Sequence, residues 1–141
     1  MSEACCLCRP NQWNDWRWQF RNRLRTKEQI GAVIKLTPEE EEALSDPKFV
    51  VGITPYFASL MDPDDPNCPI RRQAVPLNLE ALPSKVTMAD PLNEEGLSPV
   101  PRLIHRYPDR VVLLATETCH AYCRHCTRRR RVGMVERAVT G

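Results

Sequence analysis

The chain has 141 residues, one domain's worth by length, and its 42% apolar and 27% charged residues are ordinary for a globular protein. The net charge of +2 is too small to favour a nucleic-acid or membrane partner. No apolar run reaches the roughly 18–20 residues that cross a bilayer. The first residues lack a basic region followed by an apolar core, so they do not resemble a secretory signal. The expected location is the cytoplasm, where seven cysteines act as metal ligands or free thiols rather than disulfides.

The first region, residues 1–61, is expected to be helical. Apolar residues at helical spacing over Trp13–Leu24 predict one face of a first helix. Thr26–Gln29 has the sequence of a capping box, which predicts that a second helix opens there. Thr37–Glu42, with a cap, a proline and a run of glutamates, predicts the start of a third helix. Thr54–Pro55 predicts the start of a fourth.

The rest of the chain suggests a different architecture. Residues 62–104 are interrupted by prolines and are expected to form an irregular connection. The apolar run within Arg110–Thr116 predicts a fully buried strand of a parallel sheet, and a cysteine-rich loop follows it. A strand that is followed by a loop with functional residues is the basic unit of a (β/α) barrel, which needs about 250 residues when complete. We therefore expect an α/β fold in which residues 105–141 begin a partial, truncated barrel, and we expect the chain to be the N-terminal part of a longer protein.

Three cysteines carry the chemistry of this loop, in the pattern Cys119-x-x-x-Cys123-x-x-Cys126. Cysteine thiolates hold iron–sulfur clusters, commonly four at a time. Three thiolates would leave one iron of a four-iron cluster open to another ligand. The alternative is a zinc site, which would need a fourth ligand such as His120 or His125 to close a tetrahedron.

The cysteine pattern, placed directly after a predicted strand, resembles the motif of the radical S-adenosylmethionine (SAM) superfamily. The flanking residues resemble one family within it, the lysine 2,3-aminomutases, over nearly the whole chain except the first ten residues. The segments that carry this resemblance are 11–19, 36–41, 62–73, 98–101, 105–110 and 119–130.

The resemblance implies cofactors and residue roles. Members of this family combine a 4Fe-4S cluster, SAM and pyridoxal 5′-phosphate (PLP) to move an α-amino group to the β-carbon of an amino acid, a small-molecule substrate. They need an external one-electron reductant, and the full-length enzyme is expected to be a homo-oligomer. Carried over by position, the cluster ligands are Cys119, Cys123 and Cys126. The cofactor-binding residues are Arg106 and Arg110, which are expected to bind the PLP phosphate, Tyr107 between them, and His125, which is expected to lie against the adenine of SAM. Arg128 is expected to bind the substrate α-carboxylate, because a guanidinium fork pairs well with a carboxylate.

Other features stay open at the level of sequence. The Schiff-base lysine for PLP and the substrate-specificity residues lie downstream of Gly141 in the family, so the chain alone is expected to be inactive. Lysine is the expected substrate, with glutamate 2,3-aminomutase and the enzyme that modifies a lysine of translation elongation factor P as alternatives. A zinc-binding or nucleic-acid-binding module, built on the cysteines and the arginines that follow them, is an alternative of another class. No role is assigned to Cys5, Cys6, Cys8 or Cys68.

Overall fold

The computed structural model describes residues 12–83, 85 and 88–131. The three N-terminal cysteines, which have no assigned role, lie outside the described residues, as does the expected continuation of the barrel after residue 131. In the part of the chain that the structure describes, no helix is long and apolar enough to cross a membrane.

Two compact units can be distinguished, and each is described by itself. Unit 1 contains the described residues up to Leu82 together with His120–His125. Unit 2 contains the described residues from Pro83 to Cys119 and from Cys126 onward. Both units are therefore discontinuous in sequence, because the cysteine loop contributes residues to each.

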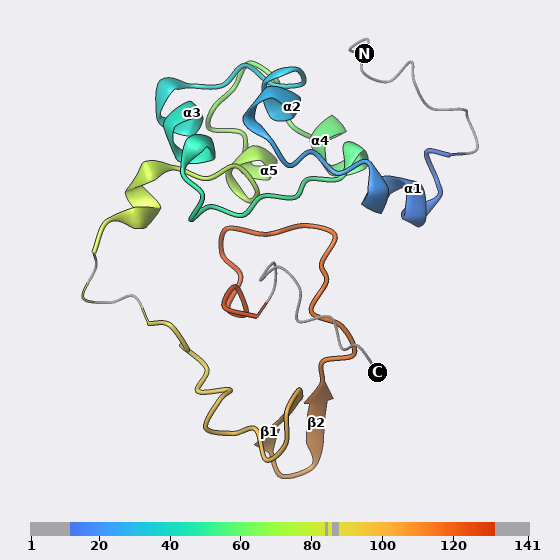
Figure 1. Cartoon of the computed structure of the whole chain (residues 1–141), viewed down its shortest axis with the longest axis vertical. Helices are drawn as coiled ribbons and strands as arrows, with labels where there is room; N and C mark the ends of the chain where they lie inside the picture. The colour runs from blue at the N-terminus through green and yellow to red at the C-terminus, as the bar shows by residue number, and fades with distance from the viewer. Residues whose placement is uncertain (1–11, 84, 86–87, 132–141) are drawn as a thin grey trace. The chain divides into compact units, whose positions relative to one another are not determined.

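Unit 1 is built from short helices (Figure 1). Their bounds are α1 Trp16–Arg21, α2 Lys27–Gly31, α3 Pro38–Ser45, α4 Pro55–Ser59, α5 Pro69–Arg72 and the 3-10 helix η2 Asn78–Ala81. Two of these, α5 and η2, lie in the stretch expected to be irregular. Prolines at the first helical position of α3, α4 and α5 explain why a proline-rich sequence can still form helices, since that position needs no amide donor.

The predicted helix starts at threonines are confirmed. Thr26 and Gln29 form a reciprocal capping box at α2, in which the Gln29 amide donates to Thr26 Oγ1 at 3.3 Å. Thr37 caps α3, because its Oγ1 accepts from the Glu40 amide at 3.3 Å and its own amide donates to Glu40 Oε2 at 2.8 Å. Thr54 caps α4 by accepting from the Phe57 amide at 3.2 Å. Each cap satisfies amide donors that a helix start leaves without intrahelical partners.

The first helix is shorter than its apolar pattern predicts. Asp15 caps it by accepting from the Arg17 amide, and it ends at Arg21. Trp16, which was expected on a packed face, is 57% exposed. Leu24 instead forms an isolated antiparallel bridge with Ile53, with backbone N···O distances of 2.8 and 3.0 Å. The long-range bridge replaces the last turn that the periodicity predicts, because it satisfies the same backbone groups.

The apolar core of unit 1 lies between these helices. Its buried members come from α2 and α4, from the turns that follow these two helices, and from the segments around residues 51–53 and 74–75; they are Ile30, Ile34, Val51, Ile53, Ala58, Met61, Ala74 and Val75. Burial of such side chains stabilises a fold by roughly 1.5–3 kcal/mol for each large one. The core therefore holds together helices that are individually too short to be stable.

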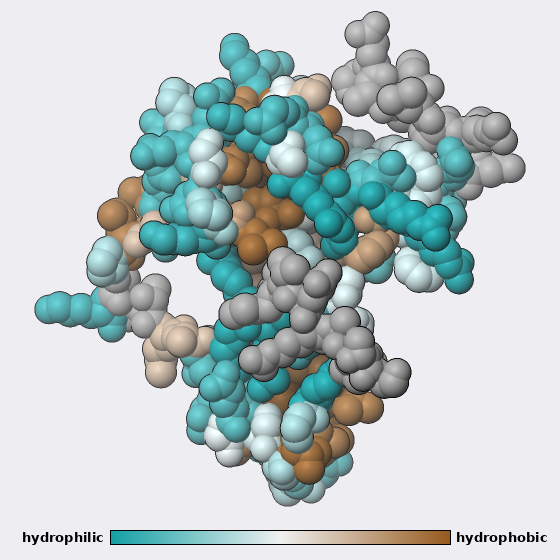
Figure 2. Space-filling model, viewed as in Figure 1, coloured by the Kyte–Doolittle hydropathy of each residue, from teal (hydrophilic) through white to brown (hydrophobic). Residues whose placement is uncertain are grey.

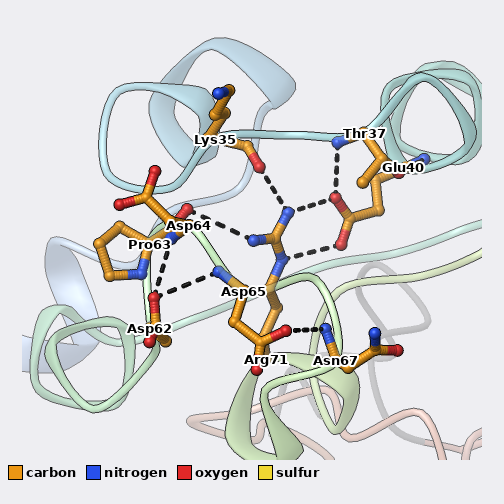
Figure 3. Close-up of polar contacts among 9 residues, drawn as sticks. All are labelled: Lys35, Thr37, Glu40, Asp62, Pro63, Asp64, Asp65, Asn67 and Arg71. Atoms are coloured by element: carbon orange, nitrogen blue, oxygen red, sulfur yellow. Dashed lines mark hydrogen bonds and ion pairs between the residues drawn. The ribbon is translucent and has the colours of Figure 1, made fainter.

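One ion pair is buried beside this core (Figure 3). The Arg71 side chain of α5 is fully buried, and its Nε donates to Glu40 Oε1 of α3 at 2.9 Å while Nη2 pairs with Oε2. Nη2 also donates to the Lys35 carbonyl at 2.6 Å, and Nη1 to the Pro63 carbonyl at 3.4 Å. The guanidinium thus connects α3, α5 and two connecting segments, and the burial of both charges is compensated by hydrogen bonds.

Unit 2 contains a two-stranded antiparallel sheet, β1 Leu103–Tyr107 and β2 Arg110–Leu113. The strand predicted from the apolar run exists, but the expectation that it is fully buried and parallel is wrong for the described chain. All four residues of β2 are exposed, and Leu113 is 66% exposed. Figure 2 shows apolar side chains gathered over this hairpin. An apolar run has the same sequence whether or not another element covers it, so the pattern could not distinguish the two cases.

The observed architecture is a small mixed fold of helices and a two-stranded sheet, consistent with part of an α/β protein. The partial barrel stays a prediction, as does the division at residues 61/62 and 104/105.

The buried ion pair leads to a stability prediction. Arg71→Met should lower the free energy of unfolding by about 3–5 kcal/mol, because it leaves the Glu40 carboxylate buried without its partner. Arg72→Met is a matched control, since Arg72 is the exposed neighbour on the same helix. Urea unfolding followed by circular dichroism should show a lower midpoint for the first variant only. Equal midpoints for the two variants would contradict this account of unit 1.

Candidate functional site

The three cysteines of the predicted cluster loop are distributed over the two units. Cys123 belongs to unit 1, whereas Cys119 and Cys126 belong to unit 2. All three are reduced thiols of intermediate exposure. Among the described residues, no group of three or more histidine, cysteine, aspartate or glutamate side chains is arranged as a metal site. Thiols that are outside disulfides and partly exposed are the donor type that an iron–sulfur cluster requires.

The part of the loop in unit 1 begins with an aromatic contact. The His120 ring lies against α1, with ring centroids 5.0 Å from Phe20 at an interplanar angle of 63° and 5.9 Å from Trp16. Edge-on contacts of this kind are a favoured arrangement of aromatic rings. The exposed Trp16 side chain therefore has a contact in the cysteine loop, the His120 ring.

Tyr122 packs against Gly52, in the segment that precedes α4. The Tyr122 amide donates to the Gly52 carbonyl at 3.3 Å. A Cβ atom at Gly52 would lie 3.0 Å from Cδ2 and Cε2 of the Tyr122 ring. The buried Arg23 guanidinium lies 3.7 Å from the Phe20 ring centroid and 5.7 Å from that of Tyr122. A larger residue at position 52 would therefore make a tight contact with the ring, which a glycine avoids.

Arg124 attaches the loop to unit 1 through both its backbone and its side chain. Its amide donates to the Gln73 carbonyl at 2.7 Å. Its guanidinium pairs with Glu80 of η2, with Nε 3.0 and 3.1 Å from the two carboxylate oxygens and Nη2 2.8 Å from Oε2. The Arg124 side chain is only 8% exposed, and its guanidinium lies 5.2 Å from the Phe49 ring centroid. A fork-to-fork pair with this geometry is among the stronger surface ion pairs.

The predicted phosphate-binding residues are brought together in the hairpin of unit 2. Tyr107 and Arg110 face each other in the register of β1 and β2. The guanidinium groups of Arg106 and Arg110 lie 6.0 and 5.3 Å from the Tyr107 ring centroid. Arg110 also pairs with Asp109 at 2.9 Å, and both side chains of that pair are largely exposed. Two cations thus gather around one exposed ring, an arrangement compatible with an anion such as phosphate.

Arg128, the predicted carboxylate-binding residue, already pairs with a carboxylate. Its Nη2 lies 2.7 Å from Glu94 Oε1, and the Glu94 side chain is 2% exposed. Arg130 pairs with the other Glu94 oxygen at 3.5 Å, with Asp90 at 2.8 Å and with Glu95 at 3.1 Å. In the structure the partner of Arg128 is therefore an internal carboxylate, and its expected binding of a substrate carboxylate stays a prediction.

His125 and Cys68 lie in different surroundings. His125 is exposed, and its predicted contact with SAM stays a prediction. Cys68 is buried in unit 1, where the Asp62 amide donates to its Sγ at 3.4 Å. That hydrogen bond lowers the pKa of the Cys68 thiol, against the opposing effect of burial. Cys68 is the N-cap residue of α5, and it has a structural place away from the three-cysteine motif.

Sequence reasoning missed Gly52, Glu80 and Glu94. The Glu80–Arg124 pair joins residues 44 positions apart, and the spacing rules for helices and strands do not extend that far. The close approach at Gly52 depends on the Tyr122 ring, 70 residues away in the chain. The one local signal was Gly52 itself, an isolated glycine within an apolar segment, which can mark a close backbone approach.

The carboxylate network of unit 2 leads to a prediction about pH. The pKa of Asp90 is lowered: burial raises it, but amide hydrogen bonds from Glu95 and Glu94 and the charge of Arg130 outweigh that effect. A depressed pKa means that Asp90 stabilises the fold at pH values above its unfolded pKa, of about 3.9, and that this contribution is lost as the pH falls through the lower folded value. Arg130→Met should move the pKa of Asp90 upward, whereas Arg110→Met should not. Carbon-13 NMR titration of the Asp90 carboxyl measures both, and an unchanged pKa in Arg130→Met would refute the assigned cause.

No family model matches the chain. It is 54% identical over 129 residues to an L-lysine 2,3-aminomutase from Acetoanaerobium sticklandii, a match that covers 90% of this chain and 31% of that protein. It is 52% identical over 126 residues to an L-lysine 2,3-aminomutase from Bacillus subtilis, covering 88% of this chain and 27% of that protein. A glutamate 2,3-aminomutase from Clostridioides difficile matches at 37% identity over 123 residues, covering 86% of this chain and 29% of that protein.

The chain thus spans about three-tenths of the length of the curated relatives that it matches. The matched residues make up nearly the whole chain, in agreement with the extent of the resemblance found from the motifs. By sequence, the chain is similar to a segment of proteins named L-lysine 2,3-aminomutase.

Proposed function

We propose that the chain is the cluster-bearing segment of a radical SAM amino acid 2,3-aminomutase, an isomerase that converts L-lysine to β-lysine. One observation carries the proposal. The Cys119-x-x-x-Cys123-x-x-Cys126 pattern occurs in a chain that is 54% identical, over 90% of its length, to a protein named L-lysine 2,3-aminomutase. A chance cysteine triplet would not be accompanied by similarity over nine-tenths of the chain.

The cysteine thiolates of the loop would hold a 4Fe-4S cluster, and three ligands would leave one iron open for SAM. When bound, the cluster with SAM supplies radical chemistry, and PLP supplies an electron-accepting ring. The chain's own contribution is to hold and orient these groups. His125, next to Cys126, is proposed to lie beside SAM, and an external one-electron reductant is proposed to serve the cluster.

The arginines are proposed to hold the anionic parts of cofactor and substrate. Arg106 and Arg110, gathered around Tyr107, would bind the PLP phosphate through charge-assisted hydrogen bonds. Arg128 would bind the substrate α-carboxylate; the position of Arg128 in the motif supports this role, and in the structure its Nη2 pairs with Glu94 Oε1. The binding groups named here recognise features common to α-amino acids and do not select a side chain.

Lysine is proposed as the substrate on the basis of relative similarity. Two proteins named L-lysine 2,3-aminomutase match at 54% and 52% identity, and the one named glutamate 2,3-aminomutase matches at 37%. The full-length enzyme is further proposed to be a cytoplasmic homo-oligomer, and the partial barrel beginning near residue 105 is proposed as its catalytic domain.

The cluster assignment predicts the outcome of anaerobic reconstitution with iron and sulfide. The chain should take on broad brown iron–sulfur absorbance, and a variant with Cys119→Ala, Cys123→Ala and Cys126→Ala should bind iron only at background level. Cys68→Ala is the matched control and should bind iron like the parent, since Cys68 lies outside the motif. A single, tightly held and colourless zinc in the parent chain, measured by elemental analysis, would instead support the zinc-module alternative.

The limited span of the chain predicts its behaviour in an activity assay. Because it corresponds to about three-tenths of its relatives, the 141-residue polypeptide alone should form no β-lysine from lysine when supplied with SAM, PLP and reductant. Amino acid analysis by mass spectrometry measures the product directly. Catalytic formation of β-lysine would mean that the chain contains every residue that the reaction needs.

A further inference from the structure

We propose that Glu80 and Gly52 are positioning residues of the cluster loop. They fix the backbone on the two sides of Cys123, and therefore the position of the Cα atom that carries its thiol side chain. The inference rests on the proposed function, because the role that it assigns concerns a cluster ligand. It adds to that function a role for the helices of unit 1, which is to position Cys123. The other two cysteines of the motif, Cys119 and Cys126, belong to unit 2.

The residue before Cys123 is fixed by Gly52. The Tyr122 amide donates to the Gly52 carbonyl at 3.3 Å, and a Cβ at position 52 would make a tight contact of 3.0 Å with two carbons of the Tyr122 ring. Gly52 is buried, so the ring packs against backbone that has little freedom to move. A side chain at position 52 would require the ring, and the loop backbone attached to it, to shift.

The residue after Cys123 is fixed by Glu80. The Arg124 amide donates to the Gln73 carbonyl at 2.7 Å, and the Arg124 guanidinium forms three contacts of 2.8–3.1 Å with the Glu80 carboxylate. The carboxylate side chain is 26% exposed and that of Arg124 8%, so the pair is partly shielded from solvent. Such shielding makes an ion pair more effective than one in open water.

Cys123 therefore sits between two residues whose amides both donate to carbonyls of unit 1. Its Cα is held, while its side chain stays partly exposed and so accessible to a metal. A ligand whose backbone is ordered before the metal arrives loses less conformational entropy on binding. Unit 1 would in this way preorganise the Cys123 backbone for binding of the cluster.

Alkylation of the metal-free chain tests the positioning directly. Glu80→Gln keeps the shape of the side chain but removes its charge, and should raise the rate of iodoacetamide labelling at Cys123 by about fivefold, the effect expected from losing one good ion pair. Peptide mass spectrometry reads each cysteine separately. The buried Cys68 of unit 1 reports global unfolding, and its labelling rate should stay at the parent value. Glu42→Gln, at an exposed glutamate of α3, is the matched control.

A second variant addresses the other side of the loop. Gly52→Ala should also accelerate labelling of Cys123, because the new methyl group displaces the Tyr122 ring. Gly31→Ala is the matched control, since a Cβ at this exposed glycine meets only the Leu36 side chain at 3.4 Å. The proposal is overturned if labelling of Cys123 is unchanged in Glu80→Gln and in Gly52→Ala, or rises only in step with labelling of Cys68.

Iron release separates this inference from the proposed function. In the reconstituted chain, Glu80→Gln and Gly52→Ala should lose iron to a chelator about fivefold faster than the parent, whereas Glu42→Gln and Gly31→Ala should match it. A parent chain that binds iron and sulfide, with variants that release iron at the parent's rate, overturns the positioning role alone. A parent chain that takes up no iron overturns the proposed function as well.

Discussion

The buried pair of Arg71 and Glu40 determines which segments of unit 1 meet. The short helices of this unit offer an apolar core, but apolar contacts are not directional and would tolerate several arrangements. The Arg71 guanidinium is directional: it bonds to Glu40 of α3 and to the carbonyls of Lys35 and Pro63. Glu40 in turn accepts from the Thr37 amide, so the same carboxylate caps α3 and neutralises the arginine (Figure 3). The arrangement that satisfies all these groups at once is the one observed, and it sets the position of α5 and of the segment after it, which contacts the cysteine loop at Gln73.

The arginines of the cysteine loop follow the same rule of pairing within the chain. From Cys119 onward the sequence has six arginines and one acidic residue, Glu136, which by itself suggests a basic patch for nucleic acid. In the structure three of these arginines pair with acids from earlier in the chain: Arg124 with Glu80, Arg128 with Glu94, and Arg130 with Asp90 and Glu94. An arginine that is paired in this way is less available to a phosphate backbone. The local charge imbalance therefore reflects where the partner acids lie in the sequence, and the small net charge of +2 agrees with that.

Features that depend on neighbouring residues could be predicted from the sequence, and features that depend on distant ones could not. The caps at Thr26, Thr37 and Thr54 were predicted because donor and acceptor lie within one helical turn. The strand at Arg110–Leu113 was predicted from its composition, but its exposure and antiparallel pairing depend on a partner strand and on what covers it. For the site, the cysteine pattern and its flanks indicated the resemblance to the lysine 2,3-aminomutases, and the matched relatives carry that name. The pairs Arg71–Glu40 and Arg124–Glu80, separated by 31 and 44 residues, have no local signature.

These two classes of feature meet in the cysteine loop. The thiols are defined by a local pattern, but the backbone that carries one of them is held by residues brought near by the fold, such as Gly52 and Gln73. A loop of six residues, His120–His125, cannot form these contacts without a preformed surface to receive it, because the entropy of ordering it must be offset by packing and hydrogen bonds. The helical region that precedes the loop supplies that surface. The loop and the helices therefore form one folding unit although more than 35 residues separate them in the chain, from Leu82 to His120. The pairing of a helical region with a cysteine motif in this sequence thus has a physical reason: the helical region orders the backbone of the loop that carries Cys123, the proposed cluster ligand.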